Sequence, residues 1–248
     1  MPTIKDTITT ADGTCNVTLT VPDGTGPWPG VVMYPDAGGP RAAFDEMAAR
    51  LAGLGYAVLV PDIYYRDAGW APFDMGTVFD DHEERKRLFS MIQKVTPEFM
   101  AADAVAFFDY LAARPEVTGE TFGTTGYCMG GRTSLVVAGR VPERVAVAMS
   151  FHGGGLASDD PGSPHLLADK MKAVVYVGAA ENDKSFTEDD AKTLGVALTG
   201  AGVEHTIEFY PAAHGFAVPD HVAAYDAAAA ERHWQAMEHV FGEVLASA

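Results

Sequence analysis

The segment that most limits the folds open to this chain is Gly126-Tyr127-Cys128-Met129-Gly130-Gly131. It follows a strand-like stretch, precedes an apolar helical stretch, and carries glycines two residues before and two residues after a cysteine. A nucleophile held on so tight a strand-to-helix turn needs neighbours without side chains, which Gly126 and Gly130 provide. Gly131 lets the helix pack close to the strand. The motif therefore predicts a nucleophile elbow with Cys128 at its tip, where the helix dipole favours the thiolate.

Short apolar stretches alternate with stretches of helical periodicity along the whole chain, which indicates βαβ units. We expect a mainly parallel central sheet with helices on both faces, in one domain covering residues 1–248. The first of the strands, at 15–21, is expected at the sheet edge. The expected strands are 15–21, 30–34, 56–60, 121–127, 145–151, 173–177 and 203–209, and the expected helices are 42–53, 97–113, 131–140, 187–201 and 222–246.

The stretch 62–80 is irregular and rich in aromatic residues. It follows the carboxyl end of a strand, where open α/β sheets bind ligands. Its aromatic side chains either form a pocket wall or pack a long loop onto the core, and the sequence favours neither interpretation.

Composition excludes several classes of partner. A formal charge of −17 argues against nucleic acid and anionic membrane surfaces, which both need a basic face. The N-terminal residues lack the apolar region of a signal peptide, and no apolar run reaches the roughly 18 residues of a membrane span. The two cysteines form neither a disulfide framework nor a zinc motif, so we expect no metal or cofactor. A free, reactive thiol is best suited to the cytoplasm.

A thiol nucleophile needs a base and an acid that orients it. The loop after strand 173–177 offers Glu181 and Asp183, of which Asp183 is favoured. Asp190 has another explanation, because with Thr187 it matches a capping box for the next helix.

The base is expected after the last strand, where His214 follows Tyr210-Pro211-Ala212-Ala213. His152 ends the strand 145–151 and either lines the pocket or has a structural role, the latter being favoured. The remaining histidines are expected to be uninvolved: His82, His165, His221, His233 and His239 on the surface, and His205 on a strand.

Acyl transfer also needs hydrogen-bond donors for a developing oxyanion. The backbone N–H of Met129, directly after the nucleophile, is one candidate. The loop after strand 30–34, with glycines at 38 and 39, supplies the other, and we expect it to be the N–H of Ala37.

Together, the cysteine elbow, the acidic loop with Asp183 and the segment Pro-Ala-Ala-His214-Gly-Phe resemble the dienelactone hydrolase family, over about residues 14–245. The resemblance implies an α/β-hydrolase fold and hydrolysis of a lactone by Cys128, His214 and Asp183, without metal or cofactor. It also implies a cytoplasmic enzyme that is usually a monomer, with a dimer as the alternative.

The resemblance also suggests residues that contact the substrate or the thiol. An acid before the first oxyanion donor contacts the resting thiol in the family and is typically glutamate; here it is Asp36. Two arginines hold a substrate carboxylate in the family. Arg85 matches one, whereas Val218 stands where the other would be, so one arm of this clamp is absent. The candidates for contact with substrate or thiol are thus Asp36, Arg85, Tyr127, His152 and Val218.

Two other functions remain open. A broad carboxylesterase or thioesterase would use the same residues on different substrates. A non-catalytic protein that binds a ligand or senses oxidants through Cys128 would not need the oxyanion loop, acid and histidine in this order.

Overall fold

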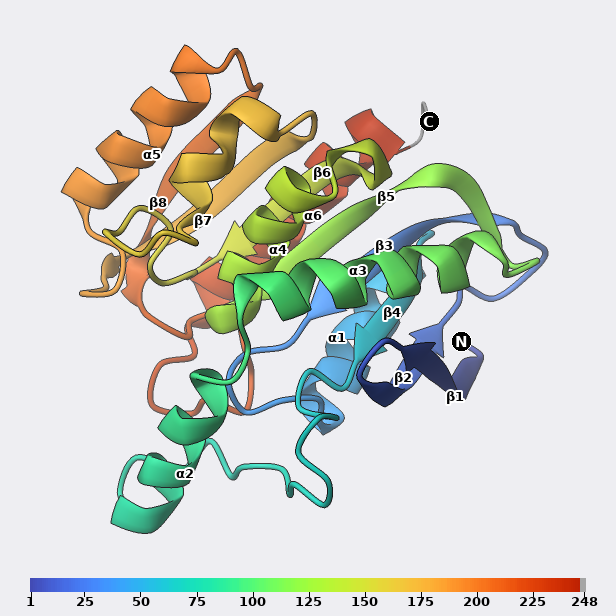
Figure 1. Cartoon of the computed structure of the whole chain (residues 1–248), viewed down its shortest axis with the longest axis horizontal. Coiled ribbons are helices and arrows are strands. Elements are labelled where there is room, and N and C mark those ends of the chain that lie inside the picture. The colour runs from blue at the N-terminus through green and yellow to red at the C-terminus, as the bar shows by residue number, and fades with distance from the viewer. Residues whose placement is uncertain (246–248) are drawn as a thin grey trace.

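The computed structural model describes residues 1–245, and the eight strands in this range form one sheet (Figure 1). Their order across the sheet is β1-β2-β4-β3-β5-β6-β7-β8. β1 and β2 are antiparallel to their neighbours, and the six strands from β4 to β8 in that order are parallel, as predicted. The strands are β1 (Thr3–Thr10), β2 (Gly13–Thr20), β3 (Trp28–Tyr34), β4 (Ala57–Pro61), β5 (Val117–Tyr127), β6 (Val145–Phe151), β7 (Val174–Asn182) and β8 (His205–Ala213).

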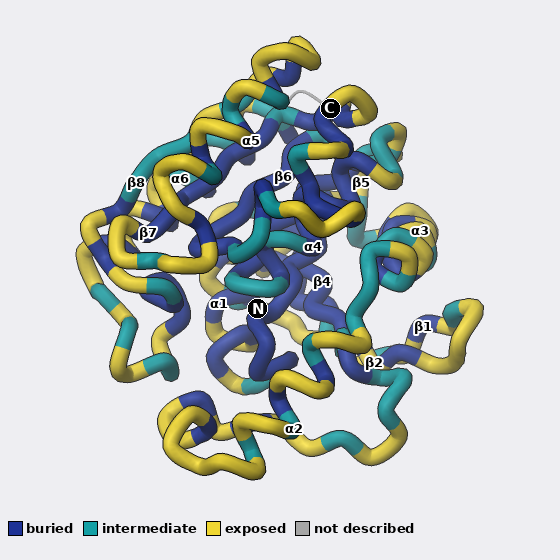
Figure 2. Tube along the Cα trace, turned by 60° about the vertical axis from the view of Figure 1, so that its left-hand side comes forward, coloured by how far each residue is buried: buried dark blue, intermediate teal, exposed yellow. Residues whose placement is uncertain are grey.

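Helices cover both faces of the sheet, which confirms the predicted α/β architecture. α1 and α6 bury their apolar sides against one face, and α3, α4 and α5 against the other. The buried parts of the chain accordingly run through the middle of the molecule and the exposed parts around it (Figure 2). The helices are α1 (Ala42–Gly53), α2 (His82–Ile92), α3 (Pro97–Ala112), α4 (Met129–Arg140), α5 (Glu188–Gly200) and α6 (Ala227–Leu245), with short 3-10 helices η1 (Pro142–Arg144) and η2 (Pro164–Lys170).

Two elements differ from the sequence expectation. The edge strand is β1, which the sequence did not predict, and β2 lies inside it, so the prediction of 15–21 as the edge is wrong. β1 is polar and mostly exposed, and therefore lacks the apolar run that marks the other strands. α2 was also not predicted, because within it only Leu88 and Met91 are buried. Figure 1 shows α2 well away from the sheet.

The last helix begins at Ala227, five residues later than predicted, and the predicted end at 246 lies outside the described residues. By contrast, the predicted capping box of α5 is confirmed, since Thr187 and Asp190 bond to each other's backbone N–H groups. No helix within residues 1–245 is long and apolar enough to cross a membrane.

The carboxyl ends of the parallel strands lie along one edge of the sheet, which is where ligands bind in such folds. β5 begins earlier than predicted, whereas β7 and β8 begin and end later. Three chemically reactive side chains directly follow these strands. Those residues are Cys128 after β5, Asp183 after β7 and His214 after β8.

Candidate active site

Cys128 sits at the tip of a strained turn between β5 and α4. Its backbone has φ 55° and ψ −116°, a conformation that non-glycine residues rarely adopt. A Cβ atom on Gly126 would lie 2.0 Å from the carbonyl oxygen of Gly130, and one on Gly130 would lie 2.2 Å from that of Tyr34. The steric demand predicted for these two glycines is therefore confirmed. Surrounding backbone contacts hold the strained cysteine in place.

A cavity of about 190 Å³ opens beside Cys128. Its polar side chains come from the ends of the strands, and most of its apolar side chains come from α2 and the irregular segment before it. The aromatic stretch 62–80 thus has both expected roles: Phe79 lines the cavity, whereas Tyr64 and Phe73 are buried. The lining residues are Asp36, Ala37, Met75, Phe79, Leu88, Phe89, Ile92, Cys128, His152, His214, Gly215 and His221.

His214 is bound to Asp183 beside this cavity. Nδ1–H of His214 donates to Oδ2 of Asp183 over 2.6 Å, and the Asp183 side chain is only 4% exposed. Ser185 fixes the other carboxylate oxygen, since its N–H and its hydroxyl both donate to Oδ1, at 2.8 and 2.6 Å. Glu181, the alternative acid, is exposed. Ser185 was not predicted from the sequence, although its position two residues after Asp183 is typical of an Asx turn.

The surroundings of His214 favour its protonated form. Burial opposes the charge, but the Cys128 sulfur, a hydrogen bond with it and the Asp183 carboxylate together raise the pKa of His214 to about 10. Burial likewise opposes ionisation of Asp183, but its hydrogen bonds with His214 and Ser185 lower the pKa of that carboxyl below its usual value. The imidazole therefore carries a positive charge next to the sulfur at neutral pH.

Two backbone donors, one next to Cys128 in the chain and one in the cavity wall, are free. Among residues 1–245, neither the N–H of Ala37 nor that of Met129 has a hydrogen-bond acceptor. Ala37 lines the cavity, and its carbonyl accepts from the hydroxyl of Tyr64 over 2.8 Å, which holds the loop in place. These are the two donors expected from the sequence.

Asp36 lines the cavity, but its carboxylate is bound elsewhere. It accepts from Gly38 N–H and from two nitrogens of Arg41, at 2.7 to 2.9 Å. Arg41 also donates two hydrogen bonds to Asp220, and so links the loop before Ala37 to the segment after His214. No hydrogen bond joins Asp36 to Cys128 within the described residues. Arg41 and Asp220 were missed, because partners 179 residues apart leave no local signal.

Three other expected contact residues lie outside the cavity lining. Arg85 is on the exposed side of α2 and donates to the carbonyl of Phe79 over 3.4 Å. Tyr127 is fully buried because its side chain points to the sheet face opposite α4, where its hydroxyl meets His233. Val218 is also fully buried, in the cluster beneath α6. The geometry thus gives no support to a substrate contact by any of the three.

Three histidines lie in positions that the sequence did not lead us to expect. His152 lines the cavity, whereas a structural role was favoured. His221 also lines it, and His233 is fully buried, so the expectation that both lie on the surface is wrong. Only tertiary packing reveals these positions.

Known proteins resemble this chain over most of its length. The model of the dienelactone hydrolase family matches residues 15–245. A Synechocystis protein named as a candidate carboxymethylenebutenolidase is 30% identical over 227 residues, which covers 90% of this chain and 89% of the relative. The carboxymethylenebutenolidase of Pseudomonas putida is 28% identical over 194 residues, covering 77% of this chain and 76% of that protein.

Solved structures show the same fold. A dienelactone-hydrolase-like promiscuous phosphotriesterase from metagenomic libraries has a TM-score of 0.76 and 26% identity, and the match covers 98% of this chain and 99% of that one. The family match over nearly all of the described residues, together with this fold, shows that the chain belongs to the dienelactone hydrolase family of α/β-hydrolases.

Proposed function

We propose that this protein hydrolyses an uncharged lactone or activated ester with Cys128 as nucleophile, His214 as proton carrier and Asp183 as the acid that orients it. One observation carries the proposal: a cysteine on a strained elbow shares a cavity with a histidine that is hydrogen-bonded to a buried carboxylate. Strain of this kind persists where function requires it.

In the first half of the reaction, the Cys128 thiolate attacks the carbonyl carbon. The bond between that carbon and the leaving oxygen of the lactone or ester then breaks, which leaves a thioacyl enzyme. The N–H groups of Ala37 and Met129 stabilise the oxyanion of the tetrahedral adduct. His214, already protonated, donates its proton to the departing oxygen. Asp183 holds the imidazole in the tautomer and orientation that this transfer needs.

In the second half, water attacks the thioacyl carbon and His214 accepts the proton. The cysteine sulfur carries no charge in the acyl enzyme, so one cause of the raised pKa of His214 is then absent. The pKa of His214 therefore falls when the base is needed. Return of the thiolate as leaving group restores the starting state.

The cavity favours uncharged substrates. Within the described residues no lysine or arginine lines it, and the carboxylate of Asp36 in its wall is already paired with Arg41. Thiol nucleophiles also favour good leaving groups, such as the enolate of an enol-lactone, because thiolate departs from the adduct more readily than a simple alkoxide. Relatives named carboxymethylenebutenolidase are consistent with lactone hydrolysis. A broader esterase would use the same steps on other acyl groups.

An oxidant sensor is less well supported. The second cysteine, Cys15, is fully buried in β2, and both cysteines are free. Cys15 is therefore not accessible as a resolving thiol for an oxidised Cys128.

The test uses 4-nitrophenyl butyrate and an enol-lactone, α-angelica lactone. Cys128→Ala and His214→Ala should each lose nearly all turnover of both substrates with unchanged circular dichroism. Cys15→Ala, which removes the other thiol, is the matched control and should keep its turnover. Normal rates in folded Cys128→Ala would refute the assignment of the nucleophile.

A further inference from the structure

His152 is held in the cavity by an unusual backbone conformation. Among residues 1–245 only two residues other than glycine have positive φ, Cys128 at 55° and His152 at 38°, and both line this cavity. The His152 N–H donates to the carbonyl of Gly178 over 2.8 Å, which fixes the turn after β6 to β7. Such strain persists only where the surrounding structure maintains it, and it clusters at functional sites.

The ring of His152 has no hydrogen-bond partner on either nitrogen, although the residue is only 1% exposed. It lies between the rings of His214 and Phe216, whose centroids are each 5.2 Å away. A buried polar group without a partner lowers stability, so an unpaired one next to a cavity calls for a ligand.

The other buried histidine behaves differently. In His233, Nδ1 bonds to the carbonyl of Ala230 and Nε2 lies 3.3 Å from the hydroxyl of Tyr127. A histidine that serves only the core thus has both nitrogens satisfied in this protein. His152 has neither, which argues against a purely structural role.

The ring is uncharged. Burial and the positive charge on His214 together hold the pKa of His152 well below its usual value. A neutral imidazole offers one donor and one acceptor, and it cannot form an ion pair with a substrate carboxylate. Neither ring nitrogen is exposed to the cavity, so the ring has to turn to meet a ligand. Because the cavity walls are largely apolar, the group that His152 then binds is a single uncharged oxygen.

We propose that His152 determines specificity by hydrogen bonding to an uncharged oxygen in the acyl part of the substrate, such as an ether, hydroxyl or carbonyl group. The inference rests on the proposed function and adds the substrate class. Discrimination arises because an acyl group with only methylenes at that position leaves the imidazole unpaired.

A pair of isosteric esters tests this. In 4-nitrophenyl methoxyacetate an ether oxygen replaces one methylene of 4-nitrophenyl butyrate. We expect wild-type kcat/KM, divided by the rate constant with hydroxide to correct for intrinsic reactivity, to favour the methoxyacetate about tenfold. His152→Phe, which fills the site without a donor, should bring the corrected ratio to about one.

Two further variants separate hydrogen bonding from backbone strain. His152→Asn keeps an N–H donor and suits a positive φ, and should retain part of the preference. His152→Gly relieves the strain but has no donor, and should lose the preference.

A corrected ratio near one in the wild type would overturn the inference, and this result needs no folded variant. An unchanged ratio in His152→Phe would overturn it as well. If neither ester were hydrolysed at all, the proposed function would fail, and this inference with it.

Discussion

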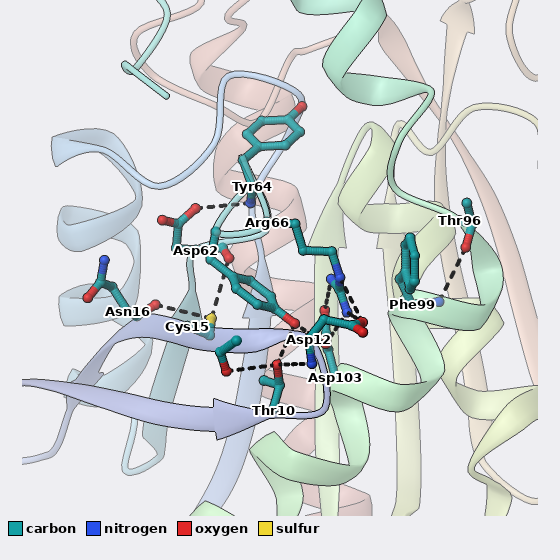
Figure 3. Close-up of polar contacts among 12 residues, drawn as sticks. Thr10, Asp12, Cys15, Asn16, Asp62, Tyr64, Arg66, Thr96, Phe99 and Asp103 are labelled. Carbon is teal, nitrogen blue, oxygen red and sulfur yellow. Dashed lines mark hydrogen bonds and ion pairs between the residues drawn. The ribbon is translucent and has the colours of Figure 1, made fainter. Parts of the chain in front are cut away.

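The two cysteines of this chain have opposite surroundings. Cys15 lies on a regular strand, is completely buried, and donates to the carbonyl oxygens of Asn16 and Asp62 over 3.4 Å each, beside the cluster of Arg66 and Asp103 (Figure 3). Burial and the nearby carboxylates raise the pKa of Cys15 to about 12. Cys128 instead faces a cavity from a strained turn, next to a protonated histidine.

The comparison shows that the backbone, more than the residue type, decides what a thiol does. A strand with good geometry places its cysteine among apolar neighbours and carbonyl groups, which favour the neutral thiol. A strand-to-helix turn projects its cysteine out of the sheet towards groups from other strand ends. The two thiols should therefore differ in reactivity, in their effect on His214 and in their contribution to stability.

The largest expected difference is in alkylation. Iodoacetamide at pH 7 should modify Cys128 faster than Cys15 by on the order of a thousandfold, because only the thiolate reacts and Cys15 is both neutral and inaccessible. Peptide mass spectrometry over time measures the two rates separately. Comparable rates in the folded protein would show that the two environments do not differ as described.

A side chain on Gly126 should disrupt the tight turn that holds Cys128, and with it the surroundings that distinguish Cys128 from Cys15. Gly126→Ala places a Cβ 2.0 Å from the carbonyl oxygen of Gly130. We expect a loss of about 3 kcal/mol or more in the free energy of unfolding, measured in urea. Gly200→Ala, at the end of α5 where a Cβ meets nothing within 4 Å, is the matched control and should leave stability nearly unchanged. Equal stability of the two variants would contradict the tight turn.

Removing one sulfur should shift the titration of His214, and removing the other should not. We expect Cys128→Ala to lower the pKa of His214 from about 10, whereas Cys15→Ala leaves it in place. Because the folded pKa exceeds the usual value of 6.5, protonation of His214 stabilises the fold below about pH 6.5, and this stability is lost as the pH rises towards 10. Imidazole NMR signals followed from pH 5 to 11 test the pKa, and urea unfolding over the same pH range tests the stability. The same pKa in wild type and Cys128→Ala would contradict the coupling.

The smallest effect is expected for the buried thiol. Cys15→Ala should cost about 1 to 2 kcal/mol of stability through lost packing, with kcat/KM for 4-nitrophenyl butyrate unchanged. Thermal unfolding and steady-state rates of the same preparation measure the two quantities. A large loss of activity without a loss of stability would give Cys15 a role that its burial does not suggest.

Local sequence signals were enough to find the residues that directly follow the strands. The glycines around Cys128 report the tight turn, and Asp183 and His214 each come after an apolar run that marks a parallel strand. Parallel strands bring such positions to one edge, so three separate local predictions combined into one site.

What the sequence could not provide depends on contacts between distant segments. The link of Asp36 through Arg41 to Asp220 joins residues with no regular spacing. Arg85 was expected at the substrate because of a resemblance, yet the turn of α2 exposes it and presents Leu88 to the cavity instead. Val218 lies in the core, so that Val218→Arg would bury a charge rather than complete a carboxylate clamp.

The most direct test of Cys128 as the nucleophile is to identify the residue to which the acyl group becomes attached. His214→Ala, mixed with 4-nitrophenyl butyrate and quenched in acid, should accumulate a protein species heavier by one butyryl group, because deacylation lacks its base. Proteolysis should place the added mass on the peptide containing Cys128, with the Cys15 peptide unmodified. A butyryl group on any other residue, or release of butyrate at the wild-type rate, would contradict a thioacyl enzyme formed at Cys128.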